Sequence, residues 1–447
     1  MKKWNEIFSL ILKPGLLLKD YSRSEIRVFV SLFTLHMLAV GLSLIVNLTA
    51  IRLTGVDLYG EYIYLFNILF ILAGFCAFGA DTLLIKTISG YLESEQYPLL
   101  KGIIQYAIRL ALLFSILAGF FIVSVAGHSR HLKNLSAGES VMLFFLILPL
   151  ISIGVIFQAA LQGMKRPVYS QLTEKLFRPG LLLLIFTSLI ILGVKLNLFK
   201  LITIHMMVVA VTALASYFLL KNVLGLSFKK VKPIFEYRVW LKVSVSFLLL
   251  DVLYVLFARL DIFILGIYRT NSEIGFYNIV SKISDLCAFS LMMVNFVLAP
   301  VIAGLIANKE RFELQKLITR SARIVLLISL PVFIFLIIFR TWILAIFRIH
   351  SPEAEKALVI LCGGQFVSIF CGSVGLLLVM SGNQVEAIKS IVLAIVVGIL
   401  LNLILVPIYG IIGTATSSAI SLVVWNLLMY IFVRRKLFLH TTIFRSI

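Results

Sequence analysis

Twelve long apolar stretches alternate with short polar gaps along this 447-residue chain. Hydrophobic residues make up 61% of it and charged residues 13%, and the mean hydropathy is +1.09. A water-soluble chain of this length could not bury so much apolar surface in its own core, whereas lipid solvates the outer faces of helices of about 20 residues. The sequence therefore predicts an all-α polytopic membrane protein with about 12 transmembrane helices. The predicted spans are residues 28–50, 62–86, 102–126, 140–163, 173–194, 198–221, 239–268, 275–306, 318–340, 355–380, 386–407 and 411–433.

Lysine and arginine fall mostly on alternate gaps. Of the 40 such residues, 28 lie at the two termini and near every second gap, nine lie near the other gaps, and Arg109, Arg259 and Lys282 lie inside spans. Basic residues concentrate on the cytoplasmic side of membrane proteins, which predicts that both termini are cytoplasmic. The net charge of +20 follows from this bias, and it indicates anionic membrane lipids rather than nucleic acid as the partner.

The first 27 residues predict a cytoplasmic amphipathic segment rather than a cleaved signal peptide. The apolar run from Ile7 to Leu12 is too short for a signal, and Lys13-Pro14-Gly15 interrupts it. The four cysteines all fall inside predicted spans without the spacing of a metal site, so no metal is expected.

Two pairs of short motifs indicate that the chain contains two halves. Gly60-Glu61-Tyr62 and Gly275-Phe276-Tyr277 open spans 2 and 8, and glycine-containing gaps at 161–165 and 380–384 follow spans 4 and 10. The nearly equal offsets favour two parallel six-helix repeats, and coincidence of loop glycines is the alternative. The predicted parts are an N-terminal segment 1–27, an N-terminal bundle 28–221, a cytoplasmic linker 222–238, a C-terminal bundle 239–433 and a cytoplasmic tail 434–447.

Catalytic signatures are missing from the sequence. It contains no P-loop, no Gly-x-Ser-x-Gly motif and no His-Glu-x-x-His motif, and its longest outer gap, 127–139, is short. We therefore expect a protein that is not an enzyme and that has no catalytic residues and no cofactor. Without a nucleotide site, the energy for transport would come from the substrate gradient or from a gradient of H⁺ or Na⁺.

Five stretches resemble the bacterial polysaccharide and O-antigen flippases, a family of the multidrug/oligosaccharidyl-lipid/polysaccharide exporter superfamily. They are Asn47–Tyr62, Ala80-Asp81-Thr82, Arg259–Gly266, Gly275–Tyr277 and Leu401–Gly413. The resemblance implies two six-helix bundles around a central cavity in the bacterial inner membrane. It also implies a flippase that moves undecaprenyl-diphosphate-linked oligosaccharides, such as O-antigen repeat units, to the periplasmic leaflet by alternating access. Polysaccharide polymerase and chain-length machinery would be its protein partners.

The diphosphate of such a substrate is anionic and cannot cross hydrocarbon unaided, so its path needs cations. A charge inside a span costs about 2.5–3.5 kcal/mol on insertion scales and usually faces a cavity or a partner. The candidates for a cationic cavity are Arg109, Arg259, Lys282, Lys86 and Arg52. For Lys86 and Arg52, anchoring at the membrane surface is the alternative.

Asp251, Asp81 and Asp285 are the candidates for coupling transport to an ion. Asp251 lies near the middle of span 7 with no basic residue one turn away, and a cross-helix pair with Lys282 or Arg109 is its alternative role. Asp285 lies three residues after Lys282, so a structural salt bridge between these two is equally consistent with the sequence.

Rival functions come from other classes of membrane protein. A multidrug or cation antiporter of the same superfamily commonly has a carboxylate in the first span of a half, and residues 28–50 contain none. A major-facilitator transporter would show its arginine- and glycine-rich motif after span 2, where this chain has Ser89–Gln96. A polytopic glycan polymerase or ligase, an enzyme, would need a larger outer loop.

Overall fold

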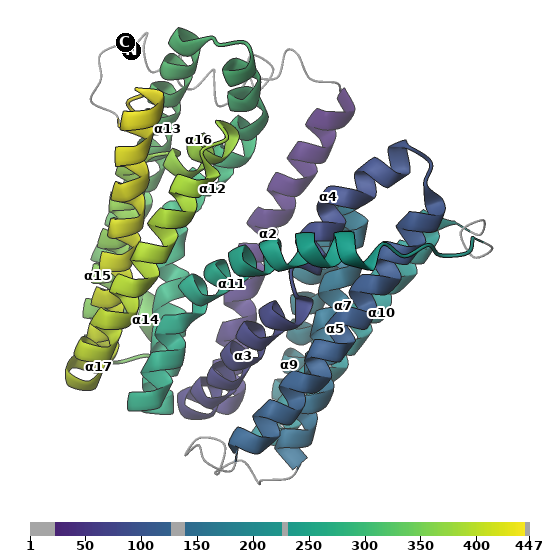
Figure 1. Ribbon diagram of the computed structural model, residues 1–447. Coiled ribbons are helices and arrows are strands. Elements are labelled where there is room, and N and C mark those ends of the chain that lie inside the picture. Colours follow the sequence, from purple (N-terminus) through teal and green to yellow (C-terminus); the bar gives the residue numbers. More distant parts are fainter. Residues whose placement is uncertain (1–22, 127–138, 226–230, 443–447) are drawn as a thin grey trace. The chain divides into compact units, whose positions relative to one another are not determined.

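The structure, a computed structural model, describes residues 23–126, 139–225 and 231–442, and every regular element in these ranges is helical (Figure 1). The elements are α2 (Arg23–Thr54), α3 (Val56–Ala77), α4 (Ala80–Glu93), α5 (Tyr97–Ala126), α7 (Glu139–Gly163), α8 (Pro167–Leu172), η2 (Thr173–Phe177), α9 (Arg178–Ile191), α10 (Leu198–Leu224), α11 (Tyr237–Tyr268), α12 (Asn271–Ala307), α13 (Arg311–Ile338), α14 (Arg340–Ile346), α15 (Pro352–Cys371), α16 (Val374–Met380) and α17 (Gln384–Leu437). Within the described ranges, eight helices are long and apolar enough to cross a membrane. The prediction of an all-α membrane protein is confirmed.

Several predicted spans are interrupted, although spans 2, 9 and 10 each still contain a helix that is long and apolar enough to cross a membrane. Span 2 comprises α3 and α4, span 10 comprises α15 and α16, and span 9 lies in α13 and ends where α14 begins. Spans 11 and 12, in contrast, form the single element α17, which contains one non-helical residue, Gly410, with φ 54° and ψ −128°.

The break between α3 and α4 creates a notch for α11. Phe78 and Gly79 both take left-handed backbone conformations, with φ 52° and 67°. A Cβ at Gly79 would lie 2.3 Å from the carbonyl oxygen of Ser244 in α11, and a Cβ at Gly102 in α5 would lie 1.8 Å from that of Ile234. Only glycine allows backbones to approach this closely. We call Gly79 and Gly102 the glycine notches.

A π-helical turn, η2, interrupts span 5. Its defining hydrogen bond runs from the backbone N–H of Arg178 to the carbonyl oxygen of Thr173, five residues back. Pro179 follows and has no N–H to donate, so the regular α-helical bonding cannot be continuous here. Such π turns are frequent at functional sites because they redirect side chains within a helix.

The chain divides into two compact units, each with its own core. One comprises Thr34–Phe263, and the other contains the described residues from Ile264 onward together with the start of α2 up to Phe33. The boundary lies inside α11, downstream of the predicted linker 222–238. We call the first the N-terminal unit and the second the C-terminal unit. Residues 1–22, and with them most of the predicted amphipathic segment, lie outside the described ranges.

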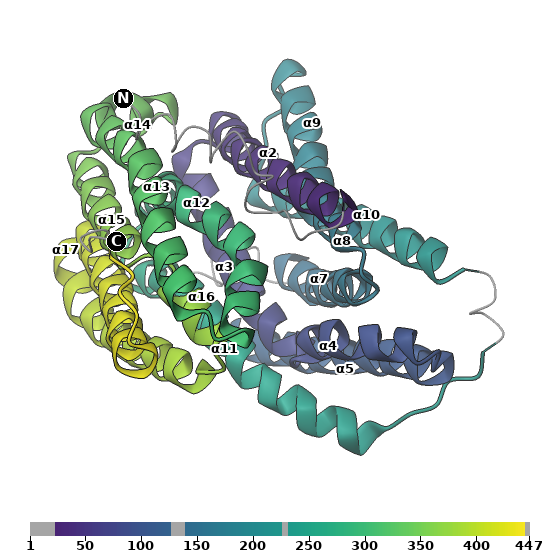
Figure 2. The ribbon, with the colours of Figure 1, turned by 90° about the horizontal axis from the view of Figure 1, so that it is seen from above.

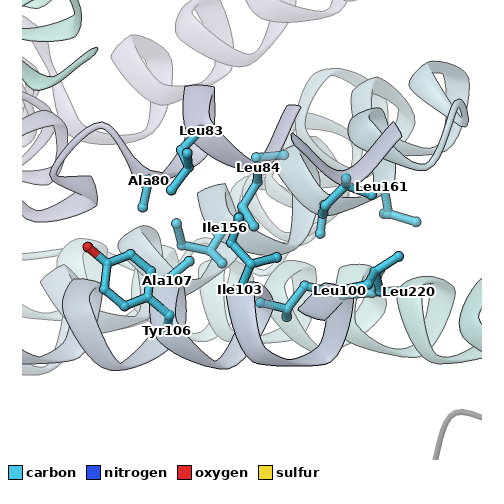
Figure 3. Packing of buried hydrophobic residues seen from close by; sticks show 14 of the residues in the cluster. Ala80, Leu83, Leu84, Leu100, Ile103, Tyr106, Ala107, Ile156, Leu161 and Leu220 are labelled. Atoms are coloured by element: carbon cyan, nitrogen blue, oxygen red, sulfur yellow. The ribbon is translucent and has the colours of Figure 1, made fainter. Parts of the chain in front are cut away.

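The core of the N-terminal unit lies where α4, α5 and α7 meet. Leu84 of α4, Ile103 of α5 and Ile156 of α7 are completely buried against one another (Figure 3). Figure 2 shows α7 between α10 on one side and the α4–α5 pair on the other. The exposed ion pair of Lys165 with Glu93 joins the turn after α7 to the end of α4, and it holds the pKa of Glu93 below its ordinary value.

The segment before α11 is docked on α5. The backbone N–H of Ile234 donates to the carbonyl oxygen of Pro98 over 3.0 Å, and Lys101 Nζ donates to the carbonyl oxygen of Val231 over 2.8 Å. These bonds hold the backbone at Ile234 against Gly102. The described part of the predicted linker is therefore a packed element of the N-terminal unit.

In the C-terminal unit, two residues near the start of α12 satisfy the backbone groups that the kink in α17 leaves unpaired. Arg269 donates from Nε to the carbonyl oxygen of Val406 over 3.0 Å and from Nη2 to that of Pro407 over 2.7 Å. Glu273 accepts from the N–H of Ile411 over 3.3 Å. Helix ends normally need such partners, so this pair caps both sides of the kink at Gly410.

The chain beyond α17 folds back onto the same unit. Gln315 of α13 holds the backbone of His440 by two hydrogen bonds, 2.7 Å to its carbonyl oxygen and 2.9 Å from its N–H. Leu439 and Thr441 are buried on either side of it. We call residues 438–442 the C-terminal strap.

Candidate functional site

A cavity of about 310 Å³ lies inside the N-terminal unit, between α3, α4, α7, α9, α10 and α11. Most of its lining is apolar. Its polar lining residues are Asp81, Gln158, Glu174, Arg178, Thr212, Asp251 and Tyr254. Ionisable side chains gathered in a concave, otherwise apolar site make this cavity the leading candidate for a functional site.

Asp81 and Asp251 form an acidic pair at this cavity. Thr82 Oγ1 lies 3.3 and 3.4 Å from the two carboxylate oxygens of Asp251, and the Asp81 and Asp251 carboxylates are close enough to interact electrostatically. Asp81 Oδ1 is buried without a hydrogen-bond partner among the described residues. Because α4 begins at Ala80, its positive N-terminal end favours negative charge here. The pair is thus incompletely satisfied and could exchange a cation or a proton.

Glu174 and Arg178 form a second charged group on the wall of the cavity. Arg178 Nη1 donates to Glu174 Oε1, and Gln158 Nε2 donates to Glu174 Oε2 over 3.2 Å. Both carboxylate oxygens of Glu174 are therefore occupied. Glu174 therefore offers fewer free acceptor positions for a bound cation than the aspartate pair does.

Behind Arg178, a buried chain of hydrogen bonds reaches α3. Arg178 Nη2 lies 2.8 Å from Nε2 of His205, and Nδ1 of His205 bonds the hydroxyl of Tyr62. Arginine can only donate, so Nε2 accepts and Nδ1 carries the proton that goes to Tyr62. The ring of His205 is therefore neutral. Its aromatic neighbour Phe66, with ring centroids 4.0 Å apart, packs against it.

Arg259 lies next to the cavity without lining it. Its guanidinium sits 5.0 Å from the centre of the Phe70 ring, and the guanidinium of Arg178 sits 5.5 Å from the same ring. Phe70 itself lines the cavity. The structure therefore brings one predicted cation, Arg259, to the same aromatic ring as an unpredicted one.

The other predicted cations of the N-terminal unit lie elsewhere. Arg109 of α5 contacts Phe235 and Tyr237 near the start of α11. Lys86 of α4 is exposed, with its ammonium 5.5 Å from the Phe247 ring centre, and Arg52 is exposed in the last turn of α2. None of the three lines the cavity.

Lys282 and Asp285 belong to α12 of the C-terminal unit. Lys282 is half-buried and Asp285 is exposed. Asp285 accepts a hydrogen bond of 2.8 Å from Gln365 of α15. This bond ties α12 to α15 within that unit.

Sequence reasoning missed Glu174, Arg178 and His205 as members of one site. Arg178 lies near the start of span 5, where basic residues are common, and His205 lies far away along the chain. A usable signal was present, because Glu174 and Arg178 are four residues apart in an otherwise apolar span, which is the spacing of an intrahelical ion pair.

Comparison with known proteins places this geometry in context. No family model matches the chain. The probable low-salt glycan biosynthesis flippase Agl15 of Haloferax volcanii is 24% identical over 199 residues, which is 44% of this chain and 41% of that protein. The similarity thus spans less than half of the relative's length.

Solved structures match over nearly the whole chain. An inward-facing MATE-family multidrug resistance transporter of the MOP superfamily has a TM-score of 0.72 at 14% identity, covering 88% of this chain and 93% of its own. The lipid II flippase MurJ in an inward closed conformation has a TM-score of 0.70 at 16% identity, covering 90% and 87%. The chain has the MOP-transporter fold. The predicted fold class, with two six-helix bundles, is confirmed.

A MOP superfamily transporter from Pyrococcus furiosus, described by the reverse polarity of its binding pocket, also matches. Its TM-score is 0.61 at 15% identity, covering 91% of this chain and 95% of its own. The fold is therefore shared by proteins that differ in the polarity of their pockets, and the side chains of this chain must decide its function.

Proposed function

We propose that this protein is a flippase that moves a lipid-linked oligosaccharide across a membrane by alternating access. The observation that carries the proposal is the sequence similarity to a glycan biosynthesis flippase, on a chain whose fold also matches the lipid II flippase MurJ. The cargo in this proposal is an undecaprenyl-diphosphate-linked repeat unit, such as that of O-antigen. The membrane would be the bacterial inner membrane, with both termini cytoplasmic and a polymerase and chain-length machinery acting on the product.

The anionic headgroup would be attracted by the cations that the sequence places within or beside spans. Arg259 is the best placed, because it lies against Phe70 at the edge of the N-terminal cavity. Lys282, Arg109, Lys86 and Arg52 complete the proposed set. Guanidinium groups suit a diphosphate because they donate several hydrogen bonds in one plane.

Coupling to H⁺ or Na⁺ would occur at the acidic pair. Asp251 and Asp81 line one cavity, and Asp81 Oδ1 has no hydrogen-bond partner among the described residues, whereas Asp285 lies in the other unit and accepts from Gln365. A cation or proton bound between the two aspartates would relieve their repulsion and change the charge of the cavity during the transport cycle.

A reconstituted assay tests both parts of the proposal. Proteoliposomes containing the protein and undecaprenyl-diphosphate-linked oligosaccharide are treated with an impermeant glycosidase, and the rate at which protected glycan becomes accessible is measured with and without an ion gradient. We expect Asp251→Asn to lower the gradient-driven rate at least about tenfold, because the amide cannot exchange a proton. Asp57→Asn, at an exposed carboxylate of α3, is the matched control.

The outcomes separate the two claims. Normal gradient-driven flipping by Asp251→Asn protein would exclude Asp251 from coupling while leaving the flippase intact. No flipping by the wild-type protein, with correct insertion, would overturn the flippase proposal itself.

A multidrug antiporter is the second candidate, because a MATE-family transporter matches the fold with a TM-score of 0.72. It predicts gradient-dependent efflux of a cationic dye such as ethidium from the same proteoliposomes. Dye efflux without glycan flipping would favour the antiporter.

A further inference from the structure

Arg109 lies inside a predicted span, and none of the described residues forms an ion pair with its guanidinium. It lies in the candidate span Tyr97–Phe121, twelve residues or roughly 18 Å along α5 from its start. Its side chain is exposed. Among the described residues it forms no ion pair, and its one hydrogen bond is from Nη1 to the hydroxyl of Tyr237 over 3.2 Å. Because none of the described residues forms an ion pair with it, this guanidinium is expected to take a counter-charge from its surroundings.

The guanidinium is nevertheless held in place. Its central carbon lies 5.1 Å from the centre of the Phe235 ring, and Phe235 stacks on Tyr237 with ring centroids 5.1 Å apart and an angle of 8°. Tyr237 in turn meets Tyr106 of α5 edge-on at 6.0 Å. We call Phe235 and Tyr237 the aromatic cradle.

The cradle is itself fixed by the docked segment before α11. Ile234 is bonded to Pro98, and its carbonyl oxygen lies over the notch at Gly102. Trp240, one turn after Tyr237 in α11, is buried and donates from Nε1 to the Tyr91 hydroxyl over 3.1 Å. The side chain of Arg109 is therefore held in a fixed position. Its remaining guanidinium N–H groups have no hydrogen-bond partner among the described residues.

We propose that Arg109 and its aromatic cradle form a binding site for the phosphate of a membrane lipid. A phosphate oxyanion supplies both the missing charge and the acceptors that a planar guanidinium prefers. A lipid phosphate lies at the membrane surface, and the long side chain of Arg109, seven residues into the predicted span 102–126, can extend towards it. Phe235 and Tyr237 are positioning residues, because they orient Arg109 and leave its outer N–H groups available.

The phosphate has two possible sources, an anionic phospholipid or the diphosphate of a polyprenyl carrier. Phosphate recognition by Arg109 does not depend on the source. Assignment of the phosphate to the polyprenyl carrier rests on the proposed function, in which Arg109 would be a first contact for the substrate at the cytoplasmic side.

Native mass spectrometry of the full-length protein tests the site. The protein is released from detergent with phosphatidylglycerol, undecaprenyl diphosphate or diacylglycerol, which has no phosphate, and the apparent Kd of each is measured. We expect Arg109→Gln to weaken binding of both phosphate lipids about tenfold and to leave diacylglycerol unchanged. Arg109→Lys should weaken it less, and Phe235→Leu should weaken it about threefold while Arg109 remains.

Arg166→Gln is the matched control, because Arg166 is another exposed arginine of the N-terminal unit. The thermal unfolding midpoint without added lipid checks that each variant is folded. A larger loss for undecaprenyl diphosphate would identify the carrier as the source, and equal losses would identify any phosphate headgroup. Unchanged phosphate-lipid binding by folded Arg109→Gln protein, or an equal loss for diacylglycerol, would overturn the proposal. Because the readout is binding, it is distinguishable from failure of flipping in proteoliposomes.

Discussion

At the scale of single residues, the guanidinium of Arg178 makes several contacts within the N-terminal unit. Glu174 and His205 both bond its guanidinium, Phe70 packs against it, and the residue is only 8% exposed. A partly buried ion pair adds modest stability while intact, but removal of Glu174 would leave the buried charge of Arg178 uncompensated. Arg178 and Glu174 therefore form a structural part of the cavity wall, and loss of one of the two charges would destabilise the fold.

Glu174→Gln should lower the free energy of unfolding by about 1–2 kcal/mol, because Arg178 is buried but the Glu174 side chain is 38% exposed. The amide keeps the shape of the side chain but removes the charge that Arg178 requires. The thermal unfolding midpoint of the purified protein in detergent measures the loss. Glu313→Gln is the control, because its pair with Lys316 is more exposed and spans 3.6 Å, so the change should be below about 1 kcal/mol. Equal shifts for the two variants would contradict the buried-pair account.

Some members of this site could be predicted from the sequence and others could not. Asp251 and Asp81 stood out because carboxylates are rare in spans. Their proximity could not be read from the sequence, since it depends on how α11 packs on α4. The same limit applies to His205, whose bond to Arg178 joins α9 to α10. A lone histidine in an apolar span carries no sign of its partner.

At the scale of helices, the positions of the spans were predictable, but the places where they break were not. Pro149 and Pro331 lie inside α7 and α13, which remain continuous. The structure instead interrupts spans beside glycines such as Gly79 and Gly372, whose backbones have positive φ. Proline can be accommodated within a membrane helix, whereas a left-handed residue ends it. Nothing in a single sequence distinguishes Gly79 from the glycines that remain helical.

Gly410→Ala should destabilise the C-terminal unit by at least about 1–2 kcal/mol. Its φ of 54° is unfavourable for a residue with a side chain, and the added Cβ would lie 2.4 Å from Glu273 Oε2. The change would therefore also disturb the capping of the kink. Gly304→Ala is the control, since no other group lies within 4 Å of its Cβ position in α12. Thermal unfolding compares the two, and equal midpoints would show that the kink tolerates a side chain.

Removal of the C-terminal strap should lower the unfolding midpoint of the full protein. A chain that ends at Leu437 loses the buried Leu439 and Thr441 and leaves Gln315 without its two bonds to His440. A chain that ends at Thr442 keeps all of these contacts and is the matched control. If the two truncations unfolded alike, the strap would contribute nothing to stability.

At the scale of the whole molecule, the repeated Gly-x-Tyr motif occupies equivalent places in the two units. Tyr62 bonds His205 of α10, and Tyr277 lies 2.9 Å from the hydroxyl of Ser418 in the last part of α17. Both tyrosines are buried. In each unit, a hydrogen bond of the tyrosine thus connects the second and the sixth spans of the predicted half. The sequence predicted the repeat from spacing, and the structure supplies a physical reason for keeping a tyrosine at both positions.

The positive-inside bias predicts the orientation of the molecule in the membrane. Reporter domains fused after Lys133, after Lys230 and after His440 should lie outside, inside and inside. Paired alkaline phosphatase and green fluorescent protein fusions measure the side at each point. An external signal after Lys230 would refute the arrangement of six spans on each side of the linker.

The glycine notches also bear on how the protein is made. The N-terminal unit extends to Phe263, so its last part is most of α11, which follows all six spans of the predicted N-terminal half. When a ribosome has completed α10, Gly79 and Gly102 still lack the backbone that covers them. The N-terminal unit is therefore complete only once the start of the second repeat has been synthesised, and the first six predicted spans expressed alone would leave both notches uncovered.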